Sequence, residues 1–205
     1  MKNNHYLITV SLFLSLVACN FIWISRTKQT PIVMQNAPEQ TAELFHPGDE
    51  WNDWNCGERL EWIRSLADKE TEHLGLSHVQ VVCGNPQKCI VGQYSKNTHT
   101  ILIDKEYLEN SQLINVLQVL CHEAHHVYSY ALIDLYHASP EEYHSLAVFS
   151  RVKDYEAEFS YYENGIHNLE RYQNQRVEQD ADEYAQDRAY YYYTTLRFRN
   201  VQKKI

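Results

Sequence analysis

The apolar residues between positions 113 and 131 have the pattern of a helix enclosed in a domain core. Nearly every side of such a helix would be covered by Leu113, Ile114, Val116, Leu117, Val119 and Leu120, followed by Ala124, Val127, Tyr128 and Ala131. A helix that is apolar on all sides is typically a buried one. We therefore predict that this segment forms the central helix of the domain.

Shorter patterns before this segment predict one helix and a small sheet. Apolar residues at helical spacing over 54–74, followed by Gly75, predict a first helix. Alternation of apolar and polar positions over 78–82, 89–94 and 99–104 predicts three strands. We expect these strands to form a small antiparallel sheet directly before the central helix.

Two long helices are predicted after the central one. Ser139 is a good N-cap residue and Pro140 suits the first position of a helix, which predicts a helix from there to about residue 162. Asn164 and Gly165 would end it, and residues 169–197 form the last predicted helix. The expected fold class is therefore α+β and mainly helical, with a small antiparallel sheet, a central helix and two further long helices.

The amino-terminal residues 1–28 contain an apolar run that predicts attachment to a membrane. In one interpretation, Leu16-Val17-Ala18-Cys19 ends a bacterial lipoprotein signal and Cys19 is acylated. In the other, residues 6–25 span a hydrocarbon core of about 30 Å as an uncleaved anchor. The apolar continuation Phe21-Ile22-Trp23-Ile24 favours the anchor, because mature lipoproteins usually turn polar at once. Both interpretations predict a membrane-anchored protein outside the cytoplasm.

The rest of the chain divides into a linker and one domain. Residues 29–50 contain Pro31, Pro38 and Pro47 among scattered polar residues, which is typical of a linker. Residues 51–205 would form a single domain, for which a hydrophobic content of 44% is sufficient. A net charge of −9 argues against a nucleic-acid partner, since phosphate binding needs a basic surface.

The cysteines of this domain allow more than one disulfide pattern. They lie at positions 56, 83, 89 and 121. An even number of cysteines outside the cytoplasm is consistent with disulfides. The loop from Cys83 to Cys89 is short and contains Gly84 and Pro86, so a bridge closing it is sterically reasonable. Cys121 is expected to be a small buried thiol, with pairing to Cys56 as the alternative.

The central helix carries the sequence Cys121-His122-Glu123-Ala124-His125-His126, which contains the motif His-Glu-x-x-His. Residues four apart share one face of an α-helix, so His122 and His126 can bind one Zn²⁺. Glu123 would then lean over the open position on the metal and accept a proton from water. Burying these three side chains is costly unless they are paired or hold a metal. Histidines partnered by other core groups are the alternative.

A catalytic zinc site needs a third protein ligand. The last predicted helix carries Glu178 and Asp182, which are four residues apart and therefore on one face. Taken together with His-Glu-x-x-His, this stretch resembles the gluzincin metallopeptidases, zincins in which the motif is followed by a helical Glu-x-x-Ala-Asp-x-x-Ala segment. Residues 178–185 fit that segment.

The resemblance implies a set of roles for residues on the two helices. His122, His126 and Glu178 would bind one zinc ion per chain. Glu123 would be the general base, and Asp182 would orient one of the ligand histidines. The order of short sheet, motif helix and later ligand helix also agrees with this family.

Other residues compete for the third ligand position. Glu158 on the preceding predicted helix is the second candidate, and His137 and His144 are further possibilities. The longer metzincin motif His-Glu-x-x-His-x-x-Gly-x-x-His is excluded, because positions 129 and 132 hold Ser and Leu.

These observations predict a membrane-tethered zinc metallopeptidase that hydrolyses bonds in a peptide or protein substrate. One alternative is a zinc-binding domain without activity that serves in interaction or sensing, and another is a helical interaction protein without metal. The presence of Glu123 favours the enzyme, because an inactive relative has no chemical need of it. The oxyanion would be stabilised by a Tyr or His of the last two helices, among which the sequence does not choose.

Overall fold

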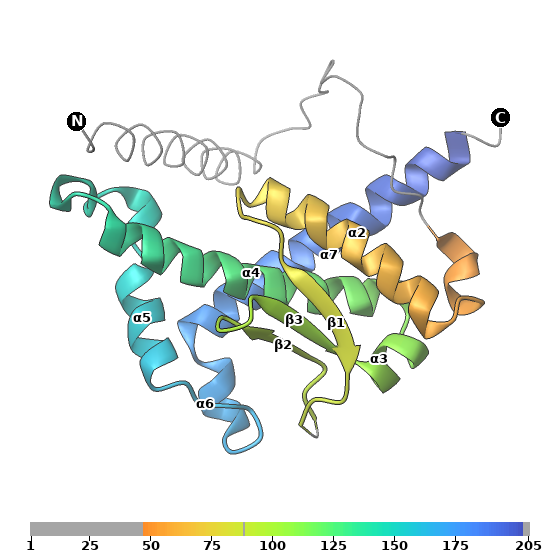
Figure 1. The fold of residues 1–205 in the computed structure, drawn as a ribbon, viewed down its shortest axis with the longest axis horizontal. Coiled ribbons are helices and arrows are strands. Elements are labelled where there is room, and N and C mark those ends of the chain that lie inside the picture. The colour runs from red at the N-terminus through yellow and green to blue at the C-terminus, as the bar shows by residue number, and fades with distance from the viewer. Residues whose placement is uncertain (1–46, 88, 203–205) are drawn as a thin grey trace.

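The computed structural model describes residues 47–87 and 89–202. The predicted membrane segment (1–28) and most of the predicted linker (29–50) lie outside the described residues. Among the residues that are described, no helix is both long enough and apolar enough to cross a membrane. The described chain is mainly helical with one small sheet (Figure 1), as expected for the predicted α+β class.

The elements follow one another in a simple order. The chain begins with the 3-10 helix η1 (Gly48–Asn52) and helix α2 (Cys56–His73), followed by strands β1 (Gln80–Gly84), β2 (Gly92–Ser95) and β3 (Thr100–Asp104). It continues with helices α3 (Lys105–Asn110) and α4 (Leu113–Ala138), the 3-10 helices η2 (Glu141–Tyr143) and η3 (Ala147–Phe149), and helices α5 (Val152–Ser160), α6 (Leu169–Gln173) and α7 (Arg176–Gln202).

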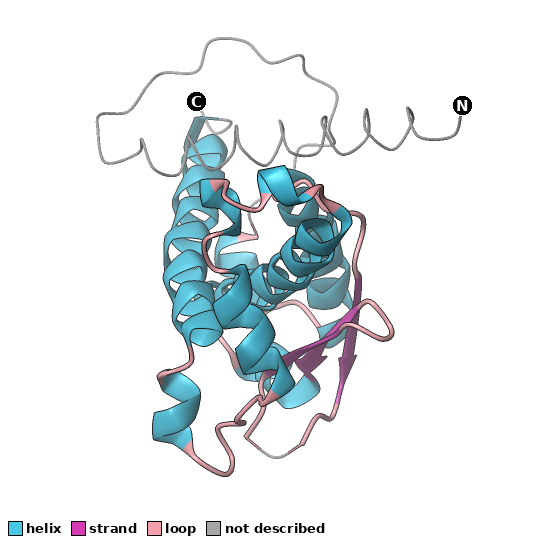
Figure 2. Ribbon diagram, turned by 90° about the vertical axis from the view of Figure 1, so that its left-hand side faces the viewer, coloured by secondary structure: helices cyan, strands magenta, loops and turns pink. Residues whose placement is uncertain are grey.

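The sheet is mixed, with the strand order β1-β3-β2 (Figure 1). Its strands lie together at one side of the helices (Figure 2). Strand β3 is parallel to β1, with Gln80 opposite Thr100, and antiparallel to β2, with Gly92 opposite Ile103. The prediction of an antiparallel sheet was therefore wrong for the pair of β1 and β3. Alternation along a strand identifies its buried face but not its neighbours. The most deeply buried strand, β3 with Ile101 and Ile103, takes the central position.

Helix α4 is the central helix, as predicted, and extends beyond the predicted segment to Ala138. Its Val116, Leu117 and Leu120 are fully buried in a core shared with the sheet and with α2. Helix α7 packs along α4 and contributes Ala185 and Ala189 to the same core. Such small side chains allow α7 to lie close to α4, which brings two helices far apart in sequence into contact.

The prediction of one continuous helix over residues 139–162 is wrong. Ser139 ends α4 rather than starting a new helix, and its Oγ donates a hydrogen bond to the carbonyl oxygen of Leu135 at 2.6 Å. Pro140 follows with an extended backbone, at ψ 145°. The two 3-10 helices then lead to α5, which begins only at Val152. Residue types that favour a helix start serve here to end the previous helix.

The predicted helix over residues 169–197 is divided into α6 and α7. The break lies at Asn174. At the start of α7, the carboxylate of Glu158 accepts hydrogen bonds from the backbone N–H groups of Arg176 and Val177, at 2.7 and 2.8 Å. The first N–H groups of a helix have no partners within the helix. This carboxylate from α5 therefore determines where α7 begins.

A buried ion pair joins α2 to α7. Glu70 of α2 is fully buried and accepts a hydrogen bond from Arg188 Nε at 2.8 Å. The hydroxyl groups of Tyr184 and Tyr192 donate to the same carboxylate. Because these three partners are spaced four residues apart on α7, they hold one face of that helix in place against α2.

The cysteines at positions 56, 83, 89 and 121 are all free. Cys121 is buried in the core, as expected for a small apolar thiol. A bridge between Cys83 and Cys89, one of the patterns that the sequence allows, is absent, and Cys89 is exposed. The Sγ atom of Cys83 instead lies 3.5 Å from that of Cys56, because the end of β1 packs beside the start of α2.

Candidate metal centre

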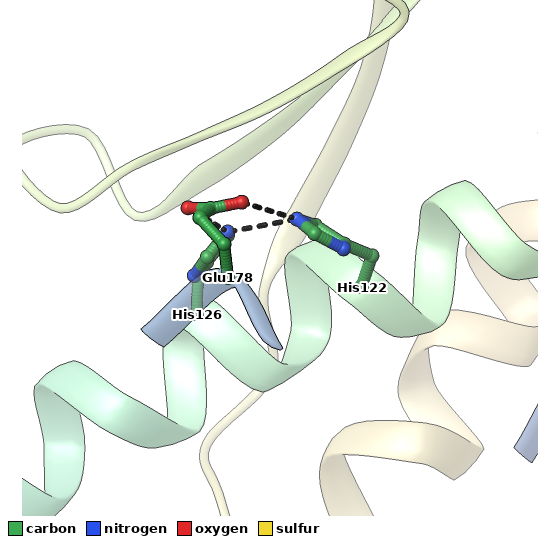
Figure 3. Close-up of side chains that lie close together, drawn as sticks. All are labelled: His122, His126 and Glu178. Carbon is green, nitrogen blue, oxygen red and sulfur yellow. Dashed lines mark hydrogen bonds and ion pairs between the residues drawn. The ribbon is translucent and has the colours of Figure 1, made fainter. Parts of the chain in front are cut away.

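Two imidazoles of α4 face each other at the centre of the candidate site. His122 and His126 are one helical turn apart, and their Nε2 atoms are 3.0 Å from each other (Figure 3). The spacing of four residues places both rings on the same side of the helix. The prediction that His122 and His126 lie on one face of a helix is therefore confirmed.

Helix α7 brings Glu178 to the same point (Figure 3). Its Oε2 lies 3.2 Å from His122 Nε2, and its Oε1 lies 3.4 Å from His126 Nε2. The Glu178 side chain is only 1% exposed, so this carboxylate is directed into the protein. One ligand atom from each of the three residues lies within 4.8 Å of the others. The three side chains form a group that could hold a metal ion.

The donor atoms of this group fit a divalent cation. Glu178 Oε2 is buried and makes no well-directed hydrogen bond within the described part of the chain. The Nε2 atoms of His122 and His126 point at each other, and two imidazoles and one carboxylate are the ligands that zinc takes in many catalytic sites. A shared cation would satisfy all three side chains at once.

Asp182 lies behind His122, one turn after Glu178 on α7. Its Oδ1 is 2.9 Å from His122 Nδ1. A hydrogen bond at Nδ1 determines the tautomer of the imidazole and leaves Nε2 free to face the cluster. The structure therefore brings Asp182 against His122, a candidate ligand.

Glu123 is buried beside the cluster, at the edge of the sheet. The pKa of its carboxyl is raised to about 7, and burial is the largest cause. The charge of Glu178 also raises this pKa, whereas the nearby His122 and a hydrogen bond from the backbone of Tyr94 lower it. A carboxyl group with a pKa near neutrality can both accept and release a proton at pH 7. The structure therefore brings a carboxyl group that can exchange a proton at neutral pH directly beside the cluster.

The charges of the cluster depend on one another. Burial alone would lower the pKa of His122, but its contacts with the carboxylates of Asp182 and Glu178 raise it to about 10. Burial lowers the pKa of His126 to about 4, with opposing effects from Glu178 and His122. Burial would raise the pKa of Glu178, yet its contacts with the two imidazoles and with phenol groups lower it to about 2. The carboxylate is therefore ionised at neutral pH.

Two tyrosines complete the surroundings of Glu178. The hydroxyl of Tyr162, just after α5, donates to Glu178 Oε1 at 2.6 Å. Tyr172 of α6 contributes to the lowered pKa of this carboxylate. Their rings meet edge to face, with centroids 6.2 Å apart. The sequence offers 16 tyrosines and no local pattern that distinguishes these two.

The other candidate ligands have different partners. Both carboxylate oxygens of Glu158 are taken up by the first backbone N–H groups of α7. His137 pairs with Glu156 on the surface at 2.8 Å. The Nε2 atom of His144 lies 2.9 Å from the carbonyl oxygen of Tyr136. The group of three ligands found in the described residues contains Glu178 and none of these side chains.

Comparisons with known proteins found no relative of this chain. No protein-family model matches the sequence, and no curated protein or solved structure is found to be similar to it.

Proposed function

We propose that this protein is a zinc-dependent metallopeptidase, a zincin of the gluzincin type. The observation that carries the proposal is the convergence of His122, His126 and Glu178 with Glu123 buried alongside them. These four side chains come from two helices, and Glu178 follows His126 by 52 residues in sequence. Burying these side chains is costly unless they are paired or hold a metal.

When bound, zinc supplies Lewis-acid activation of a water molecule at neutral pH. The protein supplies the proton transfers. Glu123 accepts a proton from the water molecule while the oxygen of that water attacks the scissile carbonyl. The same carboxyl group then gives the proton to the leaving amine. Its pKa of about 7 suits both steps. Asp182 holds the ring of His122 in the orientation that keeps Nε2 directed at the cluster.

Tyr162 is the group that we propose for stabilising the oxyanion. Its hydroxyl is a donor at the edge of the cluster, 2.6 Å from Glu178 Oε1. Burial and the charge of Glu178 raise the pKa of Tyr162, so the phenol keeps its proton. A donor aimed at the developing negative charge contributes through electrostatic stabilisation of the transition state. A substrate carbonyl in the site would compete with Glu178 for this donor.

A peptide substrate agrees with the position of strand β2. This strand is at the edge of the sheet, and Gly92 at its start lies against Glu123. An edge strand offers free backbone groups that can pair with an extended peptide. A substrate held in this way would pass beside the general base. The amino-terminal segment leads us to place the enzyme at a membrane, on its extracytoplasmic side.

The experiment that tests this function combines metal analysis with a hydrolysis assay. We expect one zinc per chain in the purified protein and cleavage of unfolded casein that a chelator abolishes and added zinc restores. Glu123→Gln should keep zinc and lose activity. Tyr162→Phe should keep zinc and lower kcat by about 10²–10³-fold. Zinc without any hydrolysis would favour an inactive binding domain, and a protein without zinc affinity would refute the metal centre.

A further inference from the structure

A pair of thiols lies outside the candidate metal centre, where α2 meets the sheet. Cys56 is the first residue of α2, and Cys83 is near the end of β1. Their Sγ atoms are 3.5 Å apart, although the residues are separated by 27 positions in sequence. Both side chains are half-buried, so a small oxidant can reach them. A disulfide bond is about 2.05 Å long, so rotation of the two side chains can bring the Sγ atoms to bonding distance.

We propose that Cys56 and Cys83 form a disulfide site, which oxidises by exchange with a small or protein disulfide. The proposal does not depend on the metallopeptidase function. It differs from a bridge between Cys83 and Cys89, which the short loop between them made sterically reasonable. The reason is geometric: strand β1 carries Cys83 to the start of α2, whereas Cys89 lies in the following loop.

The other two cysteines of the described residues are poorly placed for Cys83. Cys89 is exposed and has a backbone φ of 72°, in the left-handed region. Cys121 has no exposed surface and is enclosed in the core formed by α4 and its neighbours. Burial raises the pKa of Cys83 to about 12, and its contact with Cys56 adds to the effect. The Cys83 thiol is thus protonated at neutral pH.

The exchange with oxidised glutathione illustrates the chemistry. The thiolate of one cysteine attacks a sulfur of the oxidant, breaks its S–S bond and releases one glutathione thiolate. The second cysteine then loses its proton and attacks the mixed disulfide, which releases the second glutathione. The two protein thiols are oxidised by two electrons, and the oxidant becomes two glutathione thiols.

The bridge would tie together two elements that support the candidate site. Residues 85–91 connect Cys83 and Gly84 to Gly92, which lies against Glu123. A bond to α2 would fix the start of this connection. It would also restrict the unfolded chain, which is the principal way in which disulfides stabilise a fold.

Peptide mapping of the full-length protein provides a direct test. Trypsin places these four cysteines in four different peptides: 29–59, 70–88, 89–96 and 106–151. In particular, cleavage after Lys88 separates Cys83 from Cys89. The reduced protein is equilibrated with oxidised glutathione, free thiols are blocked in denaturant, and the digest is analysed by mass spectrometry without reduction.

We expect a linked pair of peptides 29–59 and 70–88 as the main disulfide product. The oxidised protein should also unfold at a Tm about 5 °C or more above that of the reduced protein. Cys89→Ser, the matched control, should keep both results, and Cys56→Ser should lose both. A main product that joins 70–88 to 89–96, a Cys83 that stays unlinked, or a Tm that does not rise on oxidation would overturn the proposal.

Discussion

Gly92 of β2 lies directly against the carboxylate of Glu123. A Cβ atom at position 92 would be 2.9 Å from Glu123 Oε1 and 2.5 Å from Cγ1 of Val119, both closer than normal contacts. The edge strand and the proposed general base can therefore approach each other only because residue 92 has no side chain. This contact links the sheet to the candidate metal centre.

Gly92→Ala should displace Glu123 or push β2 away from α4. We expect a loss of stability of about 1–3 kcal/mol from overpacking, and a larger fall in kcat than in zinc affinity. Isothermal denaturation, zinc titration and hydrolysis rates measure the three effects. Gly165→Ala is the matched control, because a Cβ there would meet its nearest neighbour, Tyr172, at an ordinary 3.4 Å. Equal activity of the two variants would contradict the importance of the Gly92 contact.

Replacing Glu178 and Glu158 one at a time should show which carboxylate binds the metal and which one caps α7. Glu178→Gln removes the carboxylate that faces both imidazoles, and we expect zinc affinity to fall by about 100-fold or more. Glu158→Gln weakens only the cap of α7, which should cost about 1 kcal/mol of folding stability with zinc affinity unchanged. Competition titration with a zinc chelator measures both. The reverse order of affinities would make Glu158 the ligand.

Asp182→Ala should weaken zinc binding without abolishing it. The variant loses the hydrogen bond to His122 Nδ1 but keeps all three proposed ligands. The Asp182 side chain is 64% exposed, so water can replace part of its effect, and we expect a loss of about tenfold. Asp187→Ala, which removes an exposed acid on the same helix, is the control. Identical zinc affinities of the two variants would show that Asp182 does not orient His122.

Breaking the buried pair of Glu70 and Arg188 should destabilise the whole domain. Arg188→Met leaves the fully buried Glu70 carboxylate without its cation, which we expect to cost about 3–5 kcal/mol. Adding Glu70→Gln to this variant removes the buried charge and should recover part of the loss. Chemical denaturation of the single and double variants measures this coupling. Purely additive effects would show that the two residues act independently.

Alkaline pH should unfold the protein together with the ionisation of its buried tyrosines. Burial raises the pKa of Tyr155, with a further rise from its hydrogen bond to Asp180. Burial and the charge of Glu70 raise the pKa of Tyr184 and Tyr192. A folded-state pKa above the unfolded value of about 10 means that stability is complete below pH 10 and falls above it. Each of these tyrosines should cost about 1.4 kcal/mol per pH unit there.

The measurement for this prediction follows two signals across the same titration. Tyrosinate absorbance reports ionisation, and circular dichroism reports helix content. We expect the buried tyrosines to ionise in the same cooperative step in which the helices are lost. Ionisation of every tyrosine while the helices stay intact would contradict the burial described here.

Local patterns in the sequence were sufficient for the features that depend on neighbours along the chain. The apolar run of α4 and the four-residue spacing of His122 and His126 follow from helical periodicity alone. The common face of Glu178 and Asp182 has the same origin. In each case the residues concerned belong to a single helix, so their relative positions are determined by its geometry.

Only the tertiary structure decided the relationships between separate elements. It placed β3 between β1 and β2, assigned Ser139 to the end of α4, and brought Cys83 to Cys56 rather than to Cys89. It also directed Glu178 to the histidines while Glu158 capped α7, and it distinguished Tyr162 among the tyrosines. The periodicity of a segment determines which of its faces is buried, but the partner of that face depends on how side chains from distant segments pack together.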